Sequence, residues 1–287
     1  MSGRDGDGYA WPPLALIAWP FDQGRPDFGM GAGASLLAGD RELHDALASA
    51  GWAPTLERVP PAADVVGGEV TKIFDLLRVH AGAVRAAVRR GAFPLVLSGG
   101  CISAAATVAG ARRHAEAVGT VWMDAHADLD TPDDNLSGSM DVQSLSLLTG
   151  AAWPALAATI PGFAPLAAGD VLVYGVRDLA DYQRLQVERS AVRTFDADAL
   201  TTLPPRVYLH VDLDVLDTAV GHANRYAAPG GPSLAAVLAA IDATFDHRTV
   251  LAAALTAYEP SADRSGTIRA AAHEIAARIA KRALEQR

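Results

Sequence analysis

The sequence predicts an α/β protein in which helices cover both faces of a mainly parallel sheet of about eight strands. Short, mostly apolar runs alternate with longer stretches rich in alanine and leucine. This alternation is typical of βαβ units around a parallel sheet. Half of the residues are hydrophobic and a fifth are charged, a balance that fits a globular protein and excludes a disordered one.

Eight such runs are the predicted strands. They are LALIAW from Leu14, APTLERV from Ala53, FPLVLS from Phe93, GTVWMD from Gly119, VLVYGV from Val171, AVRTF from Ala191, RVYLHVD from Arg206 and VLAAAL from Val250. The stretches between them have helical composition and largely helical apolar spacing. The predicted helices are Ala34 to Ala50, Glu69 to Arg90, Ala104 to Ala117, Ser233 to Phe245 and Ile268 to Leu284.

A single domain is expected over residues 1–287, with residues 1–12 flexible. No low-complexity linker interrupts the series of strands and helices, and no internal repeat stands out. The first residues lack the basic and then apolar order of a signal peptide, and no apolar stretch approaches the roughly 20 residues of a membrane span. A cytoplasmic location is therefore expected.

The net charge of the chain disfavours some classes of binding partner. The formal net charge is -9, and no run of lysine or arginine is dense enough to follow a phosphate backbone. Nucleic acid and anionic membrane are therefore poor partners, whereas clustered carboxylates attract metal cations. The one cysteine, Cys101, excludes an internal disulfide and fits a reducing compartment.

The strongest chemical signal is Asp124-Ala125-His126-Ala127-Asp128, which follows the strand from Gly119. In extended backbone, alternate residues share a face, so two carboxylates and an imidazole can converge on one point. Such a donor set suits Mn²⁺ or Zn²⁺, and the excess of carboxylates favours the harder ion. A solvated turn with a capping aspartate is the alternative for this segment taken alone.

A second cluster lies in HVDLDVLD from His210, where Asp212 and Asp214 alternate at an apolar strand end. Two adjacent carboxylates repel unless a positive charge separates them, and buried carboxylates need a cation. A pair of metal ions shared with the first cluster satisfies both. Taken alone, this run also fits a helix N-cap or a turn.

The third segment, LSGGCIS from Leu97, ends another strand with two glycines that allow a sharp turn. Cys101 lies at that turn. A lone cysteine is usually a small core residue, but its place at a strand end matches that of the two aspartate clusters.

Together these motifs resemble the arginase, agmatinase and formimidoylglutamase family. The resemblance rests on DAHADLDTP from Asp124 and DLDVLD from Asp212, with weaker agreement at AWPFDQGRP, YGVRD and the PGG from Pro229. It implies a three-layer αβα sandwich on an eight-stranded sheet, with two Mn²⁺ ions per chain at its carboxyl edge. Asp124 and Asp212 would bridge both ions, Asp128 would bind the first, and His126 and Asp214 the second.

The sixth ligand of that family is a histidine, and aligning on Leu97 puts Cys101 in its place. A shift of one residue would put Ile102 there and remove the ligand. Sulfur is a softer donor than Mn²⁺ prefers, so Zn²⁺ or Fe²⁺ is an alternative ion.

The resemblance implies hydrolysis of a C–N bond in a linear guanidine or amidine. Two divalent ions can activate water for attack on a planar carbon, with Asp128 accepting a proton. Asp141 takes the place of the family's proton-shuttling histidine, after a turn that begins at the substrate-binding candidate Ser137. A charge at the start of a helix is the alternative for Asp141.

The expected substrate contacts depart from arginase. Alignment on Pro260 places Ala257 where arginases have a glutamate that grips the guanidinium, and Glu259 is the substitute if the loop is displaced, or else a solvated loop charge. Asp130 replaces an asparagine that recognises substrate. Asp178 would meet an α-amino group or form a structural salt bridge. The further candidates, placed at the cavity mouth by position alone, are His222, Asn224 and Arg225.

The expected partner is a small molecule such as arginine, hydroxyarginine, agmatine, a guanidino acid or a formimino compound, and the resemblance implies a homo-oligomer. Two other functions stay open. One is a catalytically silent, metal-binding relative with a regulatory role, because Cys101, Asp141 and Ala257 depart from the family. The other is a metal-dependent amide deacetylase.

Overall fold

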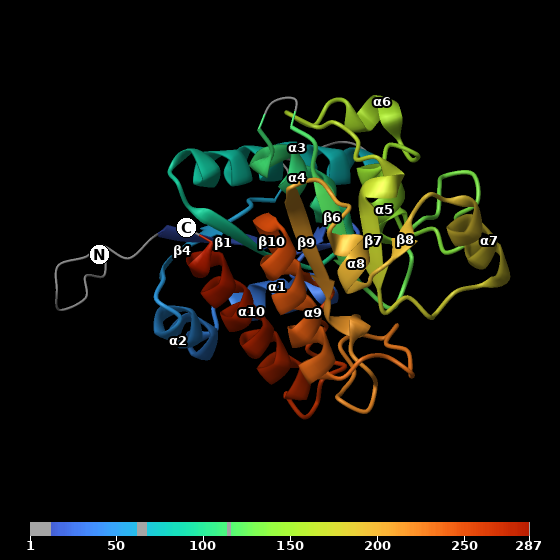
Figure 1. Ribbon diagram of the computed structural model, residues 1–287. Coiled ribbons are helices and arrows are strands. Elements are labelled where there is room, and N and C mark those ends of the chain that lie inside the picture. The colour runs from blue at the N-terminus through green and yellow to red at the C-terminus, as the bar shows by residue number, and fades with distance from the viewer. Residues whose placement is uncertain (1–12, 62–67, 114–115, 287) are drawn as a thin grey trace.

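The computed structural model describes residues 13–61, 68–113 and 116–286. Its centre is a parallel sheet with the strand order β4-β1-β5-β10-β9-β6-β7-β8 (Figure 1). The strands are β1 (Pro13–Trp19), β4 (Ala53–Arg58), β5 (Phe93–Ser98), β6 (Gly119–Met123), β7 (Val171–Tyr174), β8 (Arg193–Thr194), β9 (Arg206–Asp212) and β10 (Thr249–Thr256). The predicted fold class is confirmed; the expectation of a flexible segment 1–12 lies outside the described residues.

Helices form a layer on each face of the sheet, and each layer has its own apolar core. One layer contains α1 (Met30–Ala38), α2 (Arg41–Ser49), α8 (Ala197–Leu200), α9 (Leu234–His247) and α10 (Thr267–Glu285). The other contains α3 (Glu69–Arg89), α4 (Ala104–Ala111), α5 (Ser144–Leu148) and α6 (Pro154–Ala157). Alternate residues of β1 enter the two cores, which explains why this strand is apolar along nearly its whole length.

Two predicted helices are shorter than expected. The stretch from Ala34 to Ala50 is divided into α1 and α2, because the carboxylate of Asp40 accepts a hydrogen bond from the backbone N–H of Glu42 at 3.0 Å and caps a new helix. The predicted helix from Ala104 ends at Ala111, after which Arg112 adopts extended backbone.

Smaller elements were not predicted. A hairpin of β2 (Phe21–Asp22) and β3 (Arg25–Pro26) turns at Gln23 and Gly24, whose φ angles are 50° and 72°. Positive φ at both turn residues is typical of the type I′ turn that joins short antiparallel strands. Helix α7 (Asp181–Arg189) has no buried residue, so it lacks the apolar face that sequence patterns detect.

Strand register brings the ends of the central strands to one level. Asp212 of β9 lies beside Thr256 of β10, which lies beside Ser98 of β5. Met123 at the end of β6 is the partner of Val211, so Asp124 leaves β6 next to Asp212. The three predicted clusters therefore meet at the carboxyl edge of the sheet, where open α/β sheets form their sites.

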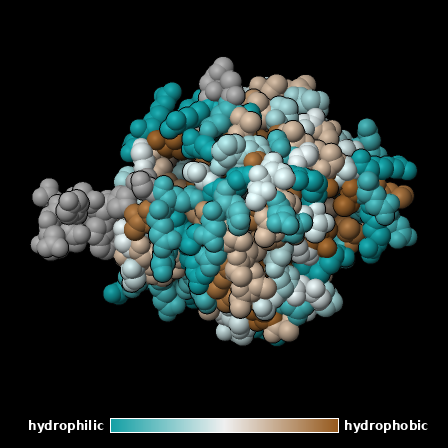
Figure 2. Space-filling view, viewed as in Figure 1, coloured by the Kyte–Doolittle hydropathy of each residue, from teal (hydrophilic) through white to brown (hydrophobic). Residues whose placement is uncertain are grey.

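The exposed surface has the usual mixture of side chains. Hydrophobic residues on the face seen in Figure 2 occur in small scattered groups between hydrophilic ones. Among the described residues, no helix combines the length and the apolar character that crossing a bilayer requires.

Candidate metal centre

A cavity of about 240 Å³ opens at this carboxyl edge. All six ligands expected from the sequence line it: Cys101, Asp124, His126, Asp128, Asp212 and Asp214. No lysine or arginine is among its lining residues. The structure therefore brings the three predicted clusters into one site, in which His126 is, among the described residues, the one lining side chain that can carry a positive charge.

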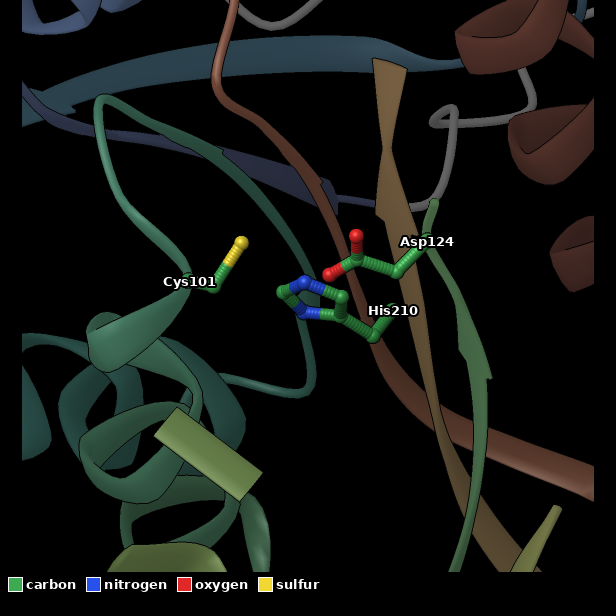
Figure 3. Close-up of side chains that lie close together, drawn as sticks. All are labelled: Cys101, Asp124 and His210. Atoms are coloured by element: carbon green, nitrogen blue, oxygen red, sulfur yellow. The ribbon is translucent and has the colours of Figure 1, made fainter. Parts of the chain in front are cut away.

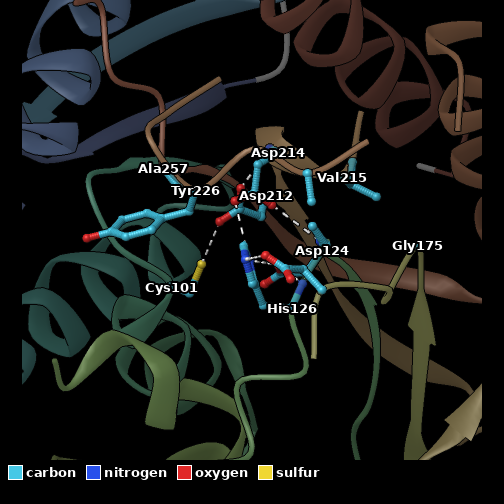
Figure 4. Close-up of polar contacts among 12 residues, drawn as sticks. Cys101, Asp124, His126, Gly175, Asp212, Asp214, Val215, Tyr226 and Ala257 are labelled. Atoms are coloured by element: carbon cyan, nitrogen blue, oxygen red, sulfur yellow. Dashed lines mark hydrogen bonds and ion pairs between the residues drawn. The ribbon is translucent and has the colours of Figure 1, made fainter. Parts of the chain in front are cut away.

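The ring of His126 lies close to two carboxylates of the site. Its Nδ1 lies 3.3 Å from Oδ1 of Asp124 and 3.4 Å from Oδ2 of Asp214 (Figure 4). Asp124 also accepts hydrogen bonds from the His126 backbone N–H at 2.7 Å and from Nε1 of Trp122 at 3.1 Å. Ligand atoms of Asp124, His126 and Asp214 all lie within 4.8 Å of one another, which suits one metal ion.

Cys101 enters the same site from the opposite wall. It begins the 3₁₀ turn η1 (Cys101–Ser103), and its Sγ donates to Oδ2 of Asp212 at 3.0 Å. Oδ1 of Asp212 accepts from the backbone N–H of Asp214 at 2.8 Å. The sulfur thus faces the carboxylates of the cavity, as expected from aligning Leu97, and Ile102 does not line the cavity.

Asp128 is held in an unusual backbone conformation. Its φ is 52°, in the left-handed region that non-glycine residues seldom adopt. Its carbonyl oxygen accepts hydrogen bonds from the N–H groups of Leu145 and Ser146, at 3.0 and 3.1 Å. Strain of this kind concentrates at functional sites, and here it turns a buried carboxylate into the cavity.

Burial is the main cause of the raised pKa values of the carboxylates in the cavity. It raises the pKa of Asp124 to about 6, and burial together with neighbouring carboxylates raises the pKa values of Asp128 and Asp212 well above the ordinary range. Burial opposes the charged form of His126, but Asp124 and Asp214 outweigh it and raise the pKa of the ring to about 9. Such a site favours protons or cations, and its oxygen and nitrogen donors fit divalent metal ions.

His210 lies directly beneath this centre and was not assigned a role from the sequence. Its ring is fully buried and stacks on Trp122 with 3.6 Å between ring centroids. Nδ1 is 3.0 Å from the Tyr208 hydroxyl, and burial lowers the pKa of His210 to about 3. The ring is therefore neutral, and ligand atoms of Cys101, Asp124 and His210 form a second group within 4.8 Å (Figure 3).

Asp141 and Ser137 also line the cavity. Oδ1 of Asp141 accepts the backbone N–H of Ile102 at 3.0 Å, so this carboxylate caps η1 from another segment. A Cβ at Gly100 would lie 2.6 Å from that oxygen, which explains the glycine. Burial raises the pKa of Asp141 to about 7, so near neutral pH it can both accept and donate a proton.

Two expected substrate contacts lie elsewhere. Asp130 is buried outside the cavity lining, where it accepts hydrogen bonds from Tyr182 and Gln183 at 3.0 Å each. These hydrogen bonds from a hydroxyl and an amide give Asp130 a structural role. Glu259 forms an ion pair with Arg225 at 3.0 Å and also lies outside the lining. Glu259 therefore does not take the place of the glutamate that arginases have at the position of Ala257. Ala257 itself lines the cavity.

The remaining candidates lie at or near the rim. Oδ2 of Asp178 is 3.6 Å from Nε2 of His126, and its side chain is 60% exposed. Asn224 lines the cavity and donates to Oδ2 of Asp214 at 3.1 Å, whereas His222 and Arg225 lie outside the lining. Asp22 lines the cavity without having been predicted; the only signal was its place in AWPFDQGRP.

A parallel sheet with helices on both faces and a carboxylate-rich cavity at its carboxyl edge is the arrangement of an α/β enzyme. The arginase family model matches residues 13–281. An arginase from Bacillus caldovelox is 31% identical over 230 residues, which are 71% of this chain and 77% of the relative. The chain belongs to the arginase family, and it is a hydrolase acting on C–N bonds of linear guanidino or amidino compounds.

Solved structures share the fold at lower identity. The arginase from Bacillus cereus superimposes with a TM-score of 0.81 at 20% identity, covering 93% of this chain and 98% of that one. The proclavaminate amidino hydrolase from Streptomyces clavuligerus gives a TM-score of 0.66 at 18% identity, covering 96% and 93%. At these identities the likeness shows the fold alone.

Proposed function

We propose that this protein is a binuclear metal-dependent hydrolase that cleaves a C–N bond of a small, linear, cationic guanidine or amidine. One observation carries the proposal. Two groups of donor atoms, each compact enough for one ion, share the carboxylate of Asp124 at the floor of the cavity. A carboxylate with two oxygen atoms can bind both ions of an adjacent pair, such as the pairs about 3.5–4 Å apart in two-metal hydrolytic sites.

The charges of the site support a cationic substrate. Two divalent ions would balance the four carboxylates of Asp124, Asp128, Asp212 and Asp214. Asp22 and Asp141 would then remain on the cavity wall to face the substrate, with no lysine or arginine among the lining residues. A guanidinium or amidinium group matches this arrangement better than an anion does.

The metal ions would supply Lewis-acid activation of the attacking water. Asp128, whose carboxylate lines the same cavity, would accept the proton that water loses. Asp141, with a pKa of about 7, would deliver a proton to the departing amine. Water thus adds to the planar carbon, the C–N bond breaks, and the amine leaves in protonated form.

The residue that bears most on the choice of substrate is Ala257. A methyl group there cannot grip a guanidinium, and Glu259 is engaged by Arg225. The absence of a carboxylate at this position weakens the case for arginine and for agmatine, because both present a guanidinium group. The other candidates are hydroxyarginine, guanidino acids and formimino compounds; the amidino substrate in the name of the Streptomyces clavuligerus neighbour adds to this range.

The test is a product assay on Mn²⁺-loaded protein with bound metal counted in the same samples. Release of urea or ammonia from one of these compounds, lost in an Asp128→Asn variant, would support the proposal. Acetate from an acetylated amine would favour a deacetylase instead. Two bound ions with no product from any compound would favour the catalytically silent relative.

A further inference from the structure

We propose that His210 is a metal ligand, so that one of the two divalent ions is held by Cys101, His210 and Asp124. This inference rests on the two-metal centre proposed above and adds a ligand to it. Cys101 stands where the family resemblance places a histidine ligand, and His210 would supply the imidazole that is lacking there. In this chain the histidine would reach the ion from β9, two residues before Asp212, rather than from the turn after β5.

The geometry of the three side chains carries the assignment. They come from three different elements, η1, the end of β6 and β9, and point toward one another in Figure 3. Their ligand atoms all lie within 4.8 Å of one another. Donors bound tetrahedrally to one Zn²⁺ at about 2.0 to 2.3 Å lie roughly 3.3 to 3.8 Å apart, so movements of about 1 Å would close the group around an ion.

The hydrogen bonds around His210 leave one ring nitrogen poorly satisfied. Among the described residues, Nδ1 has the Tyr208 hydroxyl at 3.0 Å as its partner, whereas the partner of Nε2 is the Thr256 hydroxyl at the longer distance of 3.4 Å. That hydroxyl is also 3.2 Å from the sulfur of Cys101 and 3.4 Å from Asp212. If Nε2 is unprotonated, this hydroxyl has one proton and can donate to only one of the ring nitrogen, the sulfur and the carboxylate.

The arrangement of the ring also fits a ligand. If Nδ1–H donates to the Tyr208 oxygen, Nε2 keeps its lone pair free, and a hydrogen bond on the other nitrogen is the usual way a metal-binding histidine is oriented. The Trp122 indole stacks on the ring at an interplanar angle of 7° and fixes its plane. Trp122 also donates to Asp124, so one side chain positions both donors.

The two ion positions would therefore differ in chemistry. A position with sulfur, imidazole and carboxylate donors favours Zn²⁺, Co²⁺ or Fe²⁺, whereas the position formed by His126, Asp124 and Asp214 suits Mn²⁺. A centre with two different metals follows from this asymmetry.

The test is a Co²⁺ titration of the metal-free protein followed by absorption. Because Cys101 is the only cysteine, a thiolate-to-cobalt charge-transfer band reports binding at its position alone. We expect the wild type to bind two ions, one of them with this band. His210→Gln should weaken the ion that gives the band at least about tenfold, and the matched His126→Gln should weaken the other ion and keep the band. An unchanged band and affinity in His210→Gln would overturn the proposal.

A second measurement covers a His210→Gln variant that fails to fold. In His126→Gln, His210 supplies the only imidazole in the two donor groups found among the described residues. X-ray absorption of this variant with one equivalent of Zn²⁺ should show one sulfur at about 2.3 Å and one imidazole nitrogen at about 2.0 to 2.1 Å. Sulfur and oxygen donors without imidazole would reject the assignment.

Neither readout uses a substrate. A protein with the expected spectra that hydrolyses none of the tested compounds would refute the proposed function and leave His210 as a ligand. If the protein releases urea but the spectra of His210→Gln are unchanged, the proposed function is supported and the assignment of His210 as a ligand is refuted.

Discussion

At the scale of single residues, Asp124 is the side chain on which the proposed centre depends most. It belongs to both donor groups, and it is buried. Asp124→Asn replaces a carboxylate by a neutral amide at the place where two positive ions would meet. We expect metal affinity to fall at least about 100-fold and hydrolysis to be lost.

Asp178→Asn is the matched control for this prediction. Asp178 also faces His126, but its side chain is largely exposed at the rim. The control should keep two ions per chain in elemental analysis after free metal is removed. If Asp124→Asn also kept two ions, Asp124 could not be the shared ligand.

Residues at strand ends were the ones that could be predicted. Asp212 ends β9, and Asp124, Asp128 and Asp214 come within five residues after β6 or β9, so their meeting follows from the parallel sheet. They do not alternate along extended backbone as predicted, because Asp214 lies in the 3₁₀ turn η4 (Leu213–Val215) and Asp128 has a φ of 52°. Asp130 could not be placed in this way, because it follows the left-handed turn at Asp128 that redirects the chain.

His210 was missed for a different reason. A histidine within an apolar strand is read as a core residue from sequence, and only the approach of Cys101 from β5 and Asp124 from β6 gives it partners. Those partners are distant in the chain, at positions that no local pattern connects to it.

At the scale of elements, Arg177 connects the loop after β7 to the segments that follow β9. Its guanidinium donates to the carbonyl oxygens of Gly175 at 2.8 Å, Asp214 at 2.9 Å and Val215 at 3.1 Å. It also donates to Ala228 at 2.7 Å. Arg177 belongs to the YGVRD segment of the family resemblance, and in the structure its guanidinium holds the backbone of Asp214, a proposed ligand.

Arg177→Ala should therefore affect stability and metal binding together. Several carbonyl oxygens lose a charged donor, which we expect to cost about 2 kcal/mol or more in the free energy of unfolding. Metal affinity should fall because the backbone of Asp214 is no longer fixed. Urea unfolding and calorimetric metal titration measure the two effects.

Arg184→Ala is the control, because Arg184 lies on the exposed helix α7 nearby and should change neither quantity. An Arg177→Ala protein with wild-type metal affinity would show that the loop contacts do not position Asp214.

Element boundaries were less predictable than element types. Six of the eight strands are largely buried, mostly apolar runs, whereas β4 and β8 at the sheet edges are polar and partly exposed. The end of α1 depends on a capping contact at Asp40. The β2–β3 hairpin has two residues in each strand, too few for any period to appear, and yet it brings Asp22 to the cavity.

At the scale of the whole molecule, the buried carboxylates make stability depend on metal and pH together. The pKa of Asp141 is raised to about 7 and those of Asp128 and Asp212 are raised well above the ordinary range, mainly by burial. The metal-free folded state therefore binds more protons than the unfolded state, so its stability must fall as pH rises through these values. His126, with its pKa raised to about 9, acts in the same direction.

Buried histidines limit the useful range of pH. Burial lowers the pKa values of His80 and His210 to about 3, so these rings stabilise the fold increasingly as pH rises toward 6.5, opposite to the carboxylates. Above pH 6.5 they are mostly neutral in both states. The window from pH 6.5 to 8.5 consequently isolates the groups of the proposed metal centre.

Within this window we expect metal-free protein to lose stability steadily and Mn²⁺-loaded protein to lose much less. Bound ions replace the protons and hold the carboxylates charged, so the stabilisation by metal should grow with pH. At a free metal concentration about 100 times Kd, each ion adds about 2.7 kcal/mol. Urea unfolding with a chelator or with Mn²⁺ at pH 6.5, 7.5 and 8.5 measures the difference. A stabilisation by metal that does not change with pH would mean that the ions bind away from these carboxylates, because only ligands that must lose protons couple metal binding to pH.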